Sequence, residues 1–134
     1  DSLDFSMIHH QDNTCSSPVM QFTWTADYIL GSVFVNGLQE IDFVLKSLEA
    51  TALSEPTAQY FSESQFCGYG NWILGQPQDV SGRMCGDNQL GSRGYKAYNM
   101  ILVDQDILAI DFNASHRDQA QRPQTRSSIV FRRN

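Results

Sequence analysis

Apolar and polar residues alternate along most of the chain, which is the pattern of β-strands with one buried face and one wet face. The first alternating segment is 2–8, and a polar turn cluster at 12–18 separates it from the second, 19–30. Gly31 interrupts the alternation, and the apolar segment 32–37 ends in an Asn-Gly turn signal. The N-terminal part of the chain therefore predicts three strands joined by turns.

The segment 39–53 fits two patterns. Its apolar residues at 41, 43 and 45 alternate as in a strand, whereas those at 38, 41, 45 and 48 have the spacing of one helix face. We predict a strand, because the neighbouring segments are strands. Pro56 then resets the chain, the aromatic-rich segment 57–66 predicts another strand, and 71–74 fits either a strand or a short helical turn.

The C-terminal part contains the clearest hairpin signal. Residues 98–103 and 107–112 are rich in Ile, Leu and Val and flank a short turn, which is typical of a central strand pair. A polar loop at 113–125 leads to a last strand at 127–132. About eight short strands in one chain of this length predict a single all-β domain over 1–134, an antiparallel barrel or sandwich.

Composition narrows the class of protein. The apolar fraction of 41% is that of a folded domain, and no run of about 18 apolar residues predicts a transmembrane segment. Residues 1–112 carry fourteen acidic and four basic side chains, which argues against nucleic acid as a partner because phosphates require a basic face. Residues 113–134 carry five Arg and one Asp. This basic tail either pairs with an acidic surface, a partner's or its own, or forms a solvated strand.

Three cysteines indicate the compartment. Cys67 and Cys85 enclose a Gly-rich and Pro-rich loop, and we predict a disulfide between them; three reduced, buried thiols are the alternative. A structural disulfide implies an extracytoplasmic protein. The chain starts at Asp1 without a leader pattern, so we expect a processed chain whose signal peptide is gone. Cys15 is then left over, as a free thiol or bonded to another chain.

Two further segments carry a resemblance. Asp12-Asn-Thr-Cys15 runs into Tyr28-Ile-Leu-Gly31, and Cys67-Gly with Trp72 is followed by Asp79-Val-Ser-Gly-Arg-Met-Cys85. With Arg122-Pro123 before the last strand, these motifs resemble the lipocalin-like (calycin-type) domain of small exported bacterial lipoproteins. The resemblance implies a lipocalin-like β-barrel over most of the chain.

The chain departs from this family pattern at its start. The family begins with a Gly-x-Trp strand that carries an early cysteine, which would pair with the cysteine at the position of Cys15, and no such segment precedes Asp1 here. We therefore expect a barrel that is open at its N-terminal edge. An open edge invites strand addition by a partner, and Cys15 is the candidate for an intermolecular disulfide.

Candidate sites for chemistry are few. The adjacent His9 and His10 point to opposite faces of a strand, so we expect no metal site there. Asp104 and Asp106 flank a turn and are expected to be turn formers, and Asp111 lies in an apolar strand. No catalytic motif is present, so we predict no catalytic residues and no cofactor. Residues 113–115 match a glycosylation sequon, which matters only in a eukaryotic secretory route.

Aromatic residues are the best candidates for a binding site. The candidates to line a barrel mouth for a small apolar ligand are Phe22, Trp24, Tyr28, Phe34, Phe43, Tyr60 and Phe61, with plain core as the alternative. We expect Phe22, Trp24, Tyr28 and Phe43 to line the site. The first functional hypothesis is a non-enzymatic extracytoplasmic binding or surface module. The second is a structural subunit of an extracellular homo-oligomer or polymer that uses strand addition or Cys15. The third is an enzyme with its site in the barrel mouth.

Overall fold

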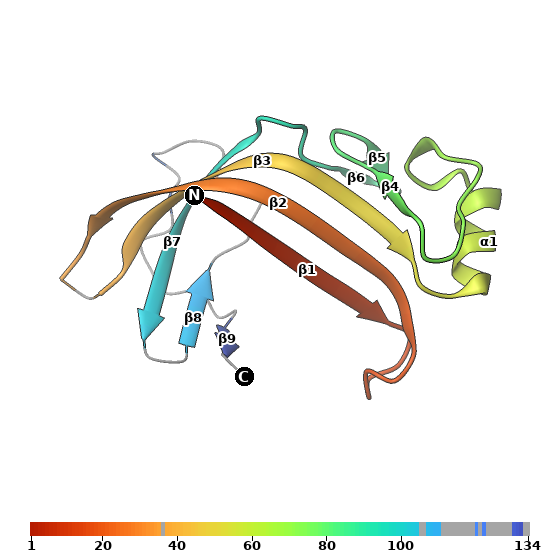
Figure 1. The fold of residues 1–134 in the computed structure, drawn as a ribbon, viewed down its shortest axis with the longest axis horizontal. Helices are drawn as coiled ribbons and strands as arrows, with labels where there is room; N and C mark the ends of the chain where they lie inside the picture. The colour runs from red at the N-terminus through yellow and green to blue at the C-terminus, as the bar shows by residue number, and fades with distance from the viewer. Residues whose placement is uncertain (36, 105–106, 111–119, 121, 123–129, 133–134) are drawn as a thin grey trace. The chain divides into compact units, whose positions relative to one another are not determined.

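We analysed a computed structural model of the 134-residue chain, which describes residues 1–35, 37–104, 107–110, 120, 122 and 130–132 (Figure 1). The described part is mostly antiparallel β-sheet, as the alternation predicts. Its elements are β1 (Ser2–His10), β2 (Pro18–Val33), β3 (Gln39–Ala52), α1 (Glu55–Glu63), the 3-10 turn η1 (Phe66–Gly68), β4 (Pro77–Asp79), β5 (Met84–Cys85), β6 (Asn88–Gln89), β7 (Lys96–Asp104), β8 (Ile107–Ile110) and β9 (Val130–Arg132).

The strands form two sheets. The larger has the order β1-β2-β3-β7-β8-β9, with β4 pairing with β3 off this path, and β5 pairs with β6 in the smaller one. Figure 1 shows β1, β2 and β3 as neighbours along this order. Among the described strands, β1 and β9 are the two ends of the path.

The described part of the chain divides into two compact units, and β2 and β3 contribute to both. One unit consists of Asp1, Asp27–Val44 and Tyr95–Asn134, and the other of Ser2–Ala26 and Leu45–Gly94. In the first unit β3 pairs antiparallel with β7, with Ile41 opposite Asn99. Alternation along the two strands places the buried residues Ile41, Phe43, Asn99 and Ile101 on one face.

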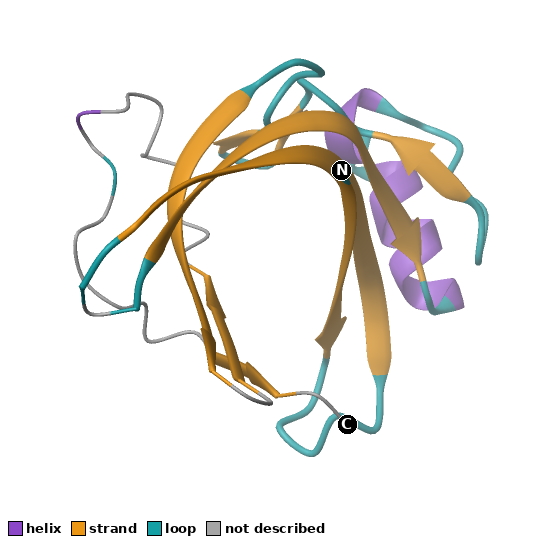
Figure 2. Ribbon diagram, turned by 60° about the vertical axis from the view of Figure 1, so that its left-hand side comes forward, coloured by secondary structure: helices purple, strands orange, loops and turns teal. Residues whose placement is uncertain are grey.

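The second unit has its own core, in which α1 packs on the sheet (Figure 2). Ala58 and Phe61, three residues apart on α1, contact the cluster that includes Ala50 and Ala52 of β3, which are fully buried. The other members are Cys67, Trp72, Val80 and Cys85. The small side chains of Ala50 and Ala52 allow α1 to approach β3 closely. The aromatic side chains of the cluster fill the space between the helix, the strand and the disulfide.

The strand predicted over 57–66 is wrong, because this segment forms α1 and η1. Ser54 has an extended backbone, and its hydroxyl accepts a hydrogen bond from the Thr57 N–H, which makes it the N-cap. Pro56 lies in the first turn, where its missing N–H costs nothing. The Ser-x-Pro start signal was present in the sequence, but the density of aromatic residues outweighed it in the prediction.

Two other segments also differ from the prediction. β2 continues through Gly31 to Val33, so glycine does not break this strand. Residues 71–74, predicted as a strand or a short helical turn, form neither. By contrast, the strand predicted over 39–53 is confirmed as β3, since its pairing with β7 resolves the ambiguity in favour of a strand.

The predicted C-terminal hairpin is confirmed as β7 and β8, which pair antiparallel from Ile101 opposite Ile110 to Asp104 opposite Ile107. The last predicted strand is present as β9. Asp106, Asp111 and the sequon at 113–115 lie outside the described residues. Within the described residues, neither helix is long and apolar enough to cross a bilayer.

Candidate functional site

Four aromatic rings gather on one face of β1 and β2. The Phe5 and Trp24 rings stack with their centroids 5.4 Å apart, and the His9 and Phe22 rings meet edge to face at 5.9 Å. We call these four residues the aromatic strip. Phe5, Phe22 and Trp24 are only partly buried and His9 is exposed, so the strip presents ring surface to its surroundings.

The opposite face of the same two strands is polar. The Gln21 amide donates to the Ser6 hydroxyl at 2.6 Å, and the Thr25 hydroxyl donates to the Asp4 carboxylate at 2.7 Å. Asp4 is next to Phe5 and Thr25 is next to Trp24, so the two pairs lie on the other side of the pleat. β1 and β2 are therefore apolar on one face and hydrogen-bonded on the other.

The structure brings together only part of the predicted ligand-lining set. Phe22 and Trp24 both belong to the aromatic strip, and Phe22 also packs with Met20 against the core of the second unit. Tyr28 and Phe43 belong to the other unit. There Tyr28 is partly exposed, and Phe43 is buried at 7% exposure on the face of β3 that holds Ile41.

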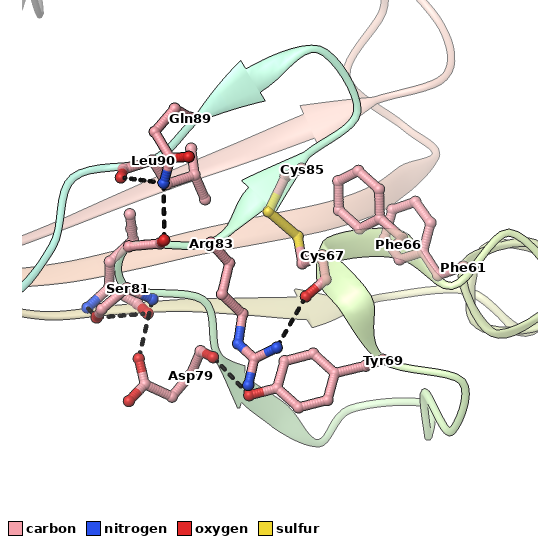
Figure 3. Close-up of a disulfide and its surroundings, with 12 residues drawn as sticks. Phe61, Phe66, Cys67, Tyr69, Asp79, Ser81, Arg83, Cys85, Gln89 and Leu90 are labelled. Carbon is pink, nitrogen blue, oxygen red and sulfur yellow. Dashed lines mark hydrogen bonds between the residues drawn. A yellow bond between two sulfur atoms is a disulfide. The ribbon is translucent and has the colours of Figure 1, made fainter.

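The predicted disulfide between Cys67 and Cys85 is present, and both residues are buried in the core (Figure 3). The same core contains a group of aromatic rings. The Phe61 ring stacks on the Phe66 ring with the centroids 4.2 Å apart and meets the Trp72 ring edge to face at 5.1 Å. The Trp72 indole N–H donates to the Phe66 carbonyl at 3.1 Å, so this buried donor is satisfied.

The Arg83 side chain, which lies between Cys67 and Cys85 in sequence, contacts the segment that follows η1, as Figure 3 shows. Its guanidinium lies 4.1 Å from the centre of the Tyr69 ring and donates to the Cys67 carbonyl at 3.2 Å. The Tyr69 hydroxyl in turn donates to the Asp79 carbonyl at 2.7 Å. The Ser81 backbone N–H, its hydroxyl and Arg93 lower the pKa of the Asp79 carboxyl. These contacts are those of a structural staple.

Cys15 is exposed and free, in a turn organised by Asp12. The Asp12 carboxylate accepts hydrogen bonds from the Thr14 hydroxyl at 2.6 Å, the Thr14 N–H at 2.8 Å and the Ser16 N–H at 3.1 Å. These donors, the Thr14 hydroxyl first, lower the pKa of Asp12 well below its usual range. The turn holds Cys15 at a positive φ of 57°, so its thiol is presented by a defined loop.

Arg122, from the basic tail, is a buried ion-pairing residue in the first unit. The Arg122 side chain is 8% exposed and forms ion pairs with Asp42 and, at 3.6 Å, with Glu40. Its guanidinium also donates to the Asn99 carbonyl at 2.6 Å and to the Ile41 carbonyl at 3.3 Å. For this residue the basic tail pairs with the chain's own acidic surface. The Arg-Pro motif marked the position, but only the fold shows that residues 80 apart meet.

Among the described residues, no group of three or more His, Cys, Asp or Glu side chains is placed to hold a metal ion. His9 instead contacts the Phe22 ring, and His10 is partly buried. The Glu40 and Asp42 carboxylates are engaged by Arg122. The aromatic strip is therefore the strongest candidate for a functional surface in the part of the chain that the structure describes.

Comparison with known proteins does not assign this surface. No protein-family model matches the chain, and a search of curated proteins finds no significant match.

Proposed function

We propose that the protein is a non-enzymatic, extracytoplasmic binding module with a lipocalin-like barrel that holds a small apolar ligand against the aromatic strip. The observation that carries this proposal is the pairing of Phe5 with Trp24 and of His9 with Phe22 on one partly exposed face. Aromatic faces bind flat apolar molecules through dispersion and area burial, with little loss of side-chain entropy.

Further features support the proposal. The polar pairs on the other face leave the rings as the apolar side of β1 and β2. The His9 ring, exposed at the end of the strip, supplies one polar group that would orient a ligand with a hydrogen-bonding end. The buried disulfide supports an extracytoplasmic location, because such bonds persist in oxidising compartments. The mostly antiparallel sheet is compatible with the lipocalin-like barrel.

The test is a titration of the full chain with N-phenyl-1-naphthylamine, a neutral apolar probe that becomes fluorescent when it leaves water. We expect saturable binding that Trp24→Leu weakens by about fivefold to tenfold, since one aromatic contact contributes on the order of 1 kcal/mol. Tyr60→Leu is the matched control, because Tyr60 is an exposed aromatic residue on α1, outside the strip. Equal affinity of the Trp24 variant and the control would reject the strip as the binding surface.

A second candidate is a structural subunit of an extracellular assembly, which the exposed Cys15 thiol favours. β1 is also at one end of the described strand order, where a partner strand would add. Non-reducing electrophoresis and native mass spectrometry of the intact protein test this candidate. Covalent dimers or longer species that disappear in Cys15→Ser support it, whereas a strictly monomeric protein with a titratable Cys15 thiol contradicts an intermolecular bond.

A further inference from the structure

The closed end of the β2–β3 hairpin, at the left of Figure 1, carries a group of exposed apolar side chains. We call this group the hairpin tip: Ile29 (67% exposed), Leu30 (48%), Val33 (67%), Phe34 (48%) and Val35 (fully exposed). Elsewhere in the described residues, large apolar side chains are exposed singly or in pairs. Five within seven positions form a patch of the kind that marks an interaction surface.

The hairpin tip is apolar on both of its sides. Ile29 and Leu30 are consecutive residues of β2 and point to opposite faces, and both are about half exposed or more. The consecutive pair Val33 and Phe34 repeats this arrangement nearer the turn. A flat protein partner covers one side of a strand and leaves the other in water. A two-sided tip matches an apolar medium that surrounds it, such as the hydrocarbon of a bilayer.

Both backbone groups of Phe34 are hydrogen-bonded within the hairpin. The Phe34 N–H donates to the Leu38 carbonyl at 2.8 Å, and the Gly37 N–H donates to the Phe34 carbonyl at 2.9 Å. Nearer the base, the side-chain amide of Gln39 donates to the Gly31 carbonyl at 3.2 Å. Satisfied peptide groups are the requirement for placing a backbone in lipid, where water is not available as a partner.

Charge distinguishes the kind of bilayer. Residues 28–38 contain no charged side chain, and the charge that faces them across the hairpin is the Glu40 carboxylate, which accepts from the Ser32 N–H and is ion-paired with Arg122. The whole chain carries a net charge of −6, so an anionic membrane surface would repel it. A zwitterionic headgroup layer, such as that of phosphatidylcholine, carries no net charge and does not oppose the approach of this acidic chain.

We propose that the hairpin tip inserts into the interface of a zwitterionic phospholipid bilayer and anchors the protein peripherally to the membrane. The insertion is shallow and does not span the membrane, because the apolar part of the hairpin is about seven residues long. This inference is independent of the proposed ligand at the aromatic strip, since the strip and the hairpin tip share no residue.

Flotation of the intact protein with phosphatidylcholine vesicles tests the proposal. We expect wild-type protein to float with the vesicles, and the double variant Phe34→Ser/Val35→Ser to show a partition coefficient lower by at least about tenfold, because two apolar side chains no longer enter the bilayer. Ile73→Ser/Leu74→Ser is the matched control, since it removes two adjacent, half-exposed apolar side chains outside the tip. Circular dichroism checks that both variants keep the wild-type sheet content.

A second measurement does not depend on removing side chains. In the Phe34→Trp variant, fluorescence quenching by brominated phosphatidylcholine should exceed that of wild type, whose only tryptophans are Trp24 and Trp72. Several results would overturn the proposal. These are equal flotation of the tip variant and its control, or flotation only when phosphatidylserine is added. Sedimentation showing a dimer that the tip variant abolishes, without flotation of wild type, would instead assign the tip to a second copy of the chain.

Discussion

At the scale of single residues, short polar side chains satisfy backbone groups that the fold buries or constrains. The Ser62 hydroxyl on α1 accepts a hydrogen bond from the backbone N–H of Trp72 at 2.8 Å and donates one to the Ala58 carbonyl at 2.9 Å. It thereby connects the helix to the loop that carries the buried Trp72. Removing one partner of such a hydrogen bond leaves the other polar group buried without a partner. The stability lost in this way is larger than the net stability that the hydrogen bond contributes.

We predict that Ser62→Ala lowers the free energy of unfolding by about 1–3 kcal/mol, because the Trp72 N–H then has no acceptor. Chemical denaturation followed by tryptophan fluorescence measures this change. Ser64→Ala is the control, since the exposed Ser64 hydroxyl donates to the Tyr60 carbonyl at the end of α1, where water replaces it. A loss in Ser64→Ala as large as that in Ser62→Ala would contradict the explanation.

Asp12 gives a prediction about pH. Its pKa in the folded protein is lowered by the Thr14 hydroxyl and by the other donors of the turn, so the carboxylate stabilises the fold above the unfolded pKa of about 3.9. This contribution is lost as the pH falls from there towards the lower pKa of the folded state. Thermal unfolding between pH 6 and pH 2 should therefore decline less steeply in Asp12→Asn than in wild type. Thr14→Val should show part of the same effect. If the unfolding temperatures of all three proteins fall in parallel with pH, the role assigned to Asp12 is wrong.

At the scale of elements, local start signals and close approaches decide where helices and strands run. α1 begins at its Ser54 cap despite the aromatic residues that favoured a strand in the prediction. β2 runs through Gly31 because the missing side chain is needed there: a Cβ at this position would lie 2.9 Å from the Glu40 Cβ and 2.6 Å from its carboxylate. A glycine in a strand therefore marks a close contact here and not a break.

We predict that Gly31→Ala destabilises the β2–β3 hairpin by about 1–2 kcal/mol, because the Glu40 Cβ is not at the flexible end of its side chain and the backbone has to shift. Thermal unfolding and amide exchange of Ser32 measure the effect. The control is Gly70→Ala, since a Cβ at Gly70 would meet its nearest neighbour, the Ser62 carbonyl, at 3.9 Å, an ordinary contact. Equal stability of Gly31→Ala and wild type would show that the strands adjust freely.

At the scale of the whole molecule, covalent and ionic links join segments that are distant in sequence. The disulfide connects η1 to β5 across 18 residues, and Arg122 reaches Asp42 and the carbonyls of β3 and β7. The disulfide restricts the unfolded chain as well as the core, so its contribution to stability is expected to be large.

We predict that Cys67→Ala/Cys85→Ala lowers the free energy of unfolding by about 3 kcal/mol, the value that loop closure implies for a loop of this length. Denaturation with and without reductant should show wild type losing a similar amount when it is reduced. Cys15→Ser serves as control, because Cys15 is exposed and outside the disulfide. If reductant leaves the free energy of unfolding of wild type unchanged, the disulfide does not stabilise the folded protein.

The sequence by itself determined the strand-rich class, the positions of β1, β3, β7 and β8, and the Cys67–Cys85 bond. These follow from alternation, turn chemistry and cysteine spacing, which are local properties. Only the tertiary structure decided that the rings of Phe5 and His9 join those of Trp24 and Phe22, and that Arg122 binds Asp42. The reason is that strand register and long-range packing bring together side chains whose separation in the chain carries no signal of their contact.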